Sequence, residues 1–72
     1  MKEYEYIIIQ EIRRSPSGKT GIYLVSNKRG GDTLGVISWY GPWRQYVFAP
    51  SEETVFSTGC LLDVVDFIKG LR

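Results

Sequence analysis

The amino-acid sequence predicts an α+β fold, a four-stranded antiparallel sheet (β-β-β-β-α) with one C-terminal amphipathic helix packed on one face. Three observations support this prediction. Residues that favour strands are concentrated in four segments, turn-forming residues separate these segments, and the apolar period becomes helical near the C-terminus. Because the chain has 72 residues, of which 43% are apolar and 24% charged, we expect residues 1–72 to form one small domain.

The first two strands are predicted from their Tyr, Ile and Val content. Glu3–Arg14 suits a pleated surface, and the turn residues Ser15–Gly18 end it. Ile22–Asn27 is the second strand, followed by Lys28–Asp32, whose two glycines indicate a hairpin loop. This loop also carries two cations, but it lacks the P-loop pattern and precedes a strand, so a plain hairpin is favoured over a phosphate site.

The next two predicted strands flank a Gly-Pro corner. Leu34–Tyr40 is the third strand, Gly41-Pro42 breaks it, and Trp43–Phe48 is the fourth. Pro50 ends the alternating pattern. Glu52–Phe56 is either a short extra strand or an extended link to the helix.

A C-terminal helix is predicted from Cys60 onward. Its apolar stripe recurs at helical spacing at Leu61, Val64, Val65, Ile68 and Leu71. Ser57 or Thr58 is the expected N-cap, because either side chain can accept hydrogen bonds from the free amides of the first turn. Gly70 lies near the expected end.

The predicted strands are apolar on both faces, although one helix covers only one face. In the first strand, alternation places Ile7 and Ile9 on one face and Tyr6, Ile8 and Ile12 on the other. In the fourth, it places Tyr46 and Phe48 on one face and Trp43 and Val47 on the other. In so short a chain the second face is expected to be covered by another copy, giving a homodimer or higher homo-oligomer, or by a bound ligand.

Composition excludes several classes of function. The net charge of +1 gives no global field for nucleic acid or membranes, so nucleic acid is not the partner we expect. With one cysteine, Cys60, and no histidine, we expect no disulfide, metal site or cofactor, and no enzyme activity. Cys60 and the aspartates Asp63 and Asp66 are interpreted as packing and solvated helix residues. No signal peptide or membrane span is apparent, so we expect a cytoplasmic protein.

The densest chemistry of the chain surrounds the Gly-Pro corner. The candidate ligand-binding residues are Trp39, Tyr40, Trp43, Arg44, Gln45 and Tyr46. Aromatic rings stack on flat ligands, a guanidinium clamps phosphate or carboxylate, and an amide reads a base or sugar edge.

Each of these residues also has a structural interpretation. Either tryptophan can be a core residue, and Arg44 can pair with Glu52 or Glu53. Alternation along the predicted fourth strand places Trp43 with Gln45 and Arg44 with Tyr46 on opposite faces.

The motif resembles a family of very small proteins encoded by phages, prophages and other mobile elements. The resemblance covers roughly the last half of the chain: it begins with Trp39–Tyr46 and continues through Phe48, Pro50, Thr54–Ser57, Cys60-Leu61, Asp63, Asp66–Ile68 and Leu71. Where many members have a cysteine and a second aromatic after Tyr46, this chain has Val47 and Ala49.

This resemblance favours a non-catalytic binding function. By analogy with other tiny phage proteins, it implies a dimer in the host cytoplasm that sequesters a nucleotide signal of bacterial immunity, an anti-defence sponge. The alternative is an interaction module that binds a host protein or single-stranded nucleic acid through an aromatic sheet face.

Overall fold

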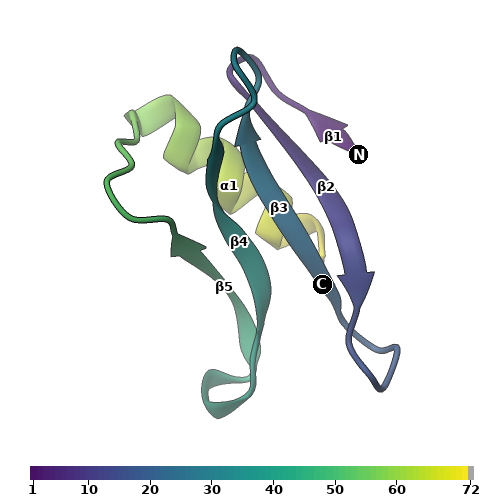
Figure 1. Cartoon of the computed structure of the whole chain (residues 1–72). Helices are drawn as coiled ribbons and strands as arrows, with labels where there is room; N and C mark the ends of the chain where they lie inside the picture. The colour runs from purple at the N-terminus through teal and green to yellow at the C-terminus, as the bar shows by residue number, and fades with distance from the viewer. Residues whose placement is uncertain (72) are drawn as a thin grey trace.

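A computed structural model describes residues 1–71 as one antiparallel sheet and one C-terminal helix (Figure 1). The elements are β1 (Lys2–Glu3), β2 (Ile7–Arg14), β3 (Gly21–Asn27), β4 (Thr33–Tyr40), β5 (Gln45–Pro50) and α1 (Thr58–Gly70). The strands lie side by side in chain order, each antiparallel to the next. The predicted α+β class is confirmed, whereas the predicted count of four strands is wrong, because the sheet has five.

The additional strand arises because the predicted first strand is interrupted at Tyr4–Tyr6. The Tyr4 N–H donates to the carbonyl of Ile7 over 2.8 Å, which closes a turn and folds β1 back onto β2. The Tyr4 hydroxyl donates to Asp66 Oδ2 on α1 over 2.9 Å, so the turn is also held by the helix. Neither Gly nor Pro marks this turn, and only contacts distant in sequence reveal it.

The hydrophobic core lies between α1 and one face of the sheet. Its buried side chains are Ile7, Ile9, Tyr23, Val25, Ile37 and Val64. The register sets Ile9 opposite Val25 and Tyr23 opposite Ile37, so that neighbouring strands contribute to the same layer.

Gly35 makes room for an aromatic ring in this layer. A Cβ at this position would lie 2.6 Å from both the Ala49 carbonyl oxygen and Phe48 Cε1. The absence of a side chain therefore lets Phe48 lie against β4, where it also meets Phe56 with ring centroids 5.3 Å apart.

The helix begins where its cap was predicted. Ser57 is the N-cap, and its Oγ accepts the Cys60 N–H over 3.2 Å; Gly70 is the last helical residue. The preceding link over residues 51–57 contains a turn and is not a strand. Within residues 1–71 no helix is long and apolar enough to span a membrane.

The other face of the sheet is open. Figure 1 shows α1 behind the sheet and no element in front of it. In the register, Leu24 lies opposite Val36, which lies opposite Ala49, and Ser38 lies opposite Val47. The partly exposed apolar residues of this face are Ile8, Ile22, Leu24, Val36 and Val47, and we call them the open sheet face.

Candidate ligand-binding site

A tight turn joins the two strands that carry most of the predicted site. Gly41–Trp43 forms a single turn of 3₁₀-helix, with Pro42 in its first positions. Arg44 closes the turn in the left-handed conformation, with φ 52° and ψ 46°, and its N–H donates to the Gly41 carbonyl over 3.1 Å.

This turn corrects the predicted start of the last strand. The strand begins at Gln45, not at Trp43, because a proline-initiated turn followed by a left-handed residue cannot continue a pleated strand. Trp43 and Arg44 therefore lie in the turn, and the predicted pairs of Trp43 with Gln45 and Arg44 with Tyr46 do not form on a strand. The register instead sets Tyr46 opposite Trp39, and Gln45 opposite Tyr40.

Trp39 and Tyr46 belong to a chain of aromatic rings on the helix side of the sheet. Trp39 meets Tyr46 edge to face, with centroids 5.5 Å apart. Tyr46 meets Tyr23 at 6.3 Å, and Tyr23 meets Phe67 of α1 at 5.1 Å. Burial raises the pKa of the Tyr23 phenol, as do the neighbouring Tyr46 and Glu11, so Tyr23 is neutral and structural.

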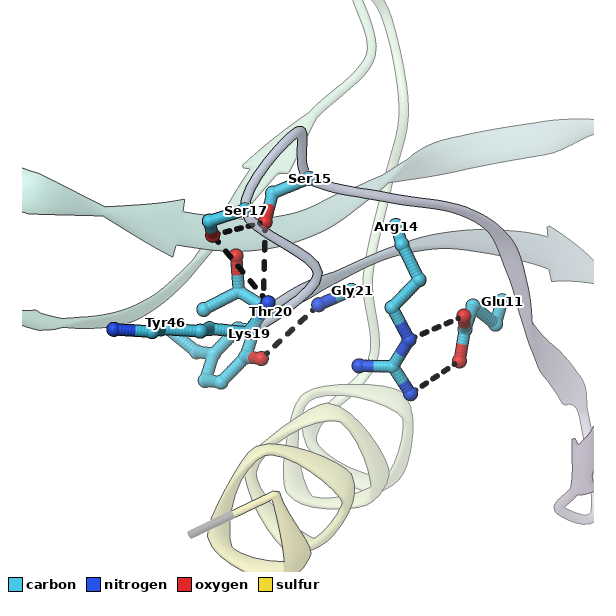
Figure 2. Close-up of polar contacts among 8 residues, drawn as sticks. All are labelled: Glu11, Arg14, Ser15, Ser17, Lys19, Thr20, Gly21 and Tyr46. Carbon is cyan, nitrogen blue, oxygen red and sulfur yellow. Dashed lines mark hydrogen bonds and ion pairs between the residues drawn. The ribbon is translucent and has the colours of Figure 1, made fainter.

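Tyr46 is fixed at both ends of its side chain. Its hydroxyl accepts the N–H of Gly21 over 3.3 Å, as Figure 2 shows, and this bond ties β5 to the start of β3 across the intervening strand. Edge-to-face contacts hold the ring itself. The Tyr46 side chain is thus held in place, and the Trp39 ring packs against it.

These residues border a cavity of about 370 Å³ beside the C-terminal end of α1. It is lined by Trp39, Arg44, Gln45, Tyr46, Ile68 and Leu71, and we call it the Arg44 cavity. Four of the six predicted site residues thus meet in one place. The helix residues Ile68 and Leu71, which the sequence indicated only as core stripe, complete it.

Tyr40 and Trp43 do not line the Arg44 cavity. Their rings meet each other edge to face with centroids 5.0 Å apart, and Trp43 is 65% exposed. Tyr40 lies on the face of β4 opposite to Trp39, because successive strand residues alternate. The turn therefore divides the predicted cluster into a cavity group and an exposed pair.

The electrostatic character of the cavity is positive. Arg44 forms no ion pair with any carboxylate of residues 1–71, so the alternative structural role, pairing with Glu52 or Glu53, is not seen there. No Asp or Glu side chain is among the lining residues, whereas Gln45 adds both a donor and an acceptor. A planar anionic molecule matches this lining.

The fold and the cavity define a small single-sheet α+β protein with an aromatic, cationic recess at one end of the sheet. The chain is 35% identical over 71 residues to an uncharacterized 9.3 kDa protein of Acholeplasma phage L2, a match that covers 99% of this chain and 90% of the phage protein. The chain therefore belongs to the family of this small phage protein. No family model and no solved structure matches it significantly.

Proposed function

We propose that this protein is a non-catalytic phage protein that captures a small nucleotide-like ligand in the Arg44 cavity. The observation that carries the proposal is the lining itself: an indole, a guanidinium and an amide converge on about 370 Å³, and no carboxylate side chain opposes them. Ligand sites of this volume class are typically apolar recesses with a few fixed polar groups.

Each lining residue has a distinct role in this proposal. Trp39 offers a ring for stacking on a base, a contact that contributes about 1–3 kcal/mol in known base-binding proteins. Arg44 binds a phosphate through its forked donors, and Gln45 reads a polar edge of the base or sugar. Ile68 and Leu71 close the apolar side of the recess.

Binding without turnover is the chemistry that this lining supports. Proton transfer by a side chain most often uses a carboxylate, imidazole or thiolate. The lining side chains include none of these. The role that fits is sequestration of a signalling nucleotide in the host cytoplasm, as an anti-defence sponge.

The open sheet face supports a second part of the proposal, a homodimer. Leu24, Val36 and Val47 leave apolar surface at the centre of this face, and a domain of 72 residues buries comparatively little apolar area by itself. A second copy that packs on the same face forms an isologous interface. None of the five residues of the open sheet face lines the Arg44 cavity, so dimerisation on that face leaves the cavity accessible.

A thermal-shift screen tests the proposal. Purified protein is heated with a panel of cyclic, linear and ADP-ribose-type nucleotides; at least one is expected to raise the melting temperature, because binding to the native state stabilises it. Arg44→Ala should abolish the shift. Arg29→Ala, which removes another exposed arginine from the loop at the other end of the sheet, should preserve it. A panel that leaves the melting temperature unchanged would overturn the proposal.

The second candidate is an interaction module that binds a host protein through the open sheet face. The aliphatic character of this face favours a protein contact over single-stranded nucleic acid, which stacks on exposed aromatic rings. The two candidates separate in solution: the module predicts a monomer that binds no nucleotide, whereas the sponge predicts a dimer that does.

A further inference from the structure

The loop that joins β2 to β3 forms a second recess beside Trp39. Residues 15–20 lie at the same end of the sheet as the β4–β5 turn (Figure 1). Together with neighbouring strand residues they border a cavity of about 620 Å³, lined by Ser15, Ser17, Lys19, Thr20, Ile22, Ser38 and Trp39. We call it the Lys19 cavity. Trp39 lines both cavities, so the two recesses adjoin at this residue. Of the residues of the open sheet face, Ile22 also lines the Lys19 cavity, which therefore lies at the edge of that face.

The serine hydroxyl groups of this loop keep a hydrogen-bond donor that no residue of the loop uses. Ser15 Oγ and Ser17 Oγ lie 3.1 Å apart, so one hydroxyl proton serves their mutual bond and the other remains available. Both oxygens already accept backbone N–H groups, from Thr20 and Lys19 respectively, which fixes the loop in the conformation that Figure 2 shows. The loop is therefore preorganised, and its remaining serine hydroxyl proton can donate to a ligand.

The charge of the loop is not neutralised by its surroundings. The carboxylate closest in sequence, Glu11, is bound by Arg14 through two contacts, Nε to Oε2 at 2.9 Å and the Nη2 donor to Oε1 at 3.1 Å. Lys19 forms no ion pair within residues 1–71. No Asp or Glu side chain lines the Lys19 cavity, just as none lines the Arg44 cavity.

The same chemistry thus occurs on both recesses that Trp39 borders. The chain has eight Asp and Glu residues, and neither lining contains one, whereas each contains a cation with hydroxyl or amide donors beside it. Cations and neutral donors without carboxylates bind phosphate groups. A ligand with a single phosphate would leave one of the two cations without a partner.

We propose that residues 15–20 form a second phosphate subsite, with Lys19 as its cation, and that the ligand is a nucleotide with two separate phosphate groups around one stacked base. This inference rests on the proposed function, because it assigns the base to Trp39 and the other phosphate to Arg44. It narrows the ligand class from nucleotides in general to dinucleotide-like molecules.

Calorimetric titration with defined probes tests this subsite. The probes are the four 5′-mononucleotides and the matching 5′-phosphorylated dinucleotides such as pApA. The wild-type protein should bind its preferred dinucleotide at least about tenfold more tightly than the mononucleotide, the effect of one added charge-assisted contact. Lys19→Gln should abolish this preference, so that the dinucleotide and the mononucleotide bind with about equal affinity. Arg29→Gln removes one positive charge from the hairpin loop at the other end and should retain the full preference.

The outcomes distinguish the subsite from the proposed function. If Arg44→Ala abolishes dinucleotide binding while Lys19→Gln retains the preference, the second subsite is overturned and the proposed function stands. If no mononucleotide or dinucleotide binds the wild-type protein, both are overturned. Lys19 is exposed, so circular dichroism and melting temperature should show a folded variant in every case.

Discussion

Arg44 combines a left-handed backbone conformation with a long charged side chain. Non-glycine residues are uncommon in this region, which costs an L-residue about 1–2 kcal/mol. Glycine adopts it without strain, and the N–H bond to Gly41 that closes the turn needs no side chain at position 44. The turn therefore does not explain the choice of arginine, whereas the proposed contact of its guanidinium with a ligand does.

Arg44→Gly should separate these two roles. The free energy of unfolding is expected to stay the same or to rise by up to about 1 kcal/mol, because relief of strain is partly offset by the greater freedom of glycine in the unfolded chain. Nucleotide binding should be lost. Urea unfolding and calorimetry measure the two quantities on one sample. A clear loss of stability would contradict a turn that does not depend on the arginine.

The raised pKa of the Tyr4 phenol predicts that the stability of the fold falls at alkaline pH. Burial and the hydrogen bond to Asp66 raise the pKa of this phenol from 10.0 to about 12. The stabilisation by Tyr4 is complete below pH 10 and is lost between pH 10 and pH 12. The reason is that the phenol has the lower pKa in the unfolded chain and loses its proton there first as the pH rises. Urea unfolding over this range should show a decline that Tyr4→Phe makes shallower. Tyr40→Phe is the control, since within residues 1–71 the exposed Tyr40 hydroxyl makes no hydrogen bond. Equal slopes for wild type and Tyr4→Phe would refute the assignment.

At the residue scale, the sequence singled out the residues around the Gly-Pro corner but divided them differently. Trp39, Arg44, Gln45 and Tyr46 gather as predicted, whereas Tyr40 and Trp43 form a separate exposed pair. Strict alternation could not foresee this division, because the left-handed residue and the 3₁₀ turn reset the direction of the chain. Lys19 was not recognised, because its place beside Trp39 depends on strand pairing and not on sequence proximity.

At the scale of elements, local signals were reliable where one residue type dictates the backbone. The hairpin loop over residues 28–32 closes with the Asn27 N–H donating to Asp32, and Gly30 and Gly31 take positive φ angles there. Ser57 caps α1 as expected. The break at Tyr4–Tyr6 was missed because it is imposed by packing on α1 and carries no turn residue.

Two glycines with opposite surroundings test how the sheet is packed. Gly35→Ala places a methyl group 2.6 Å from a backbone oxygen and should cost about 1–3 kcal/mol of unfolding free energy. Gly59→Ala, in the first turn of α1, meets Ser57 Oγ at an ordinary 3.8 Å and should stabilise by up to about 1 kcal/mol. Chemical denaturation measures both. Equal effects of the two substitutions would show that Phe48 does not lie against Gly35.

At the scale of the whole molecule, the open sheet face predicts self-association. Light scattering coupled to gel filtration should give the mass of a dimer, twice 8.2 kDa. Val36→Lys, at the centre of the face, should produce a monomer, because a buried lysine without a partner is costly. Val55→Lys introduces the same charge at a side chain that is 91% exposed in the link and should leave the dimer intact. A wild-type monomer at high concentration would contradict the predicted interface.

In the proposed complex Trp39, and not Trp43, contacts the ligand. The chain has two tryptophans, so Trp43→Phe leaves Trp39 as the only indole, and Trp39→Phe leaves Trp43. Each variant is titrated with a nucleotide that raises the melting temperature of the wild-type protein, and the tryptophan emission is recorded. Binding should quench the emission of Trp43→Phe saturably and leave the emission of Trp39→Phe unchanged. Quenching of the Trp43 emission in Trp39→Phe with a constant Trp39 emission in Trp43→Phe would contradict a contact between Trp39 and the ligand. So would an unchanged emission in both variants.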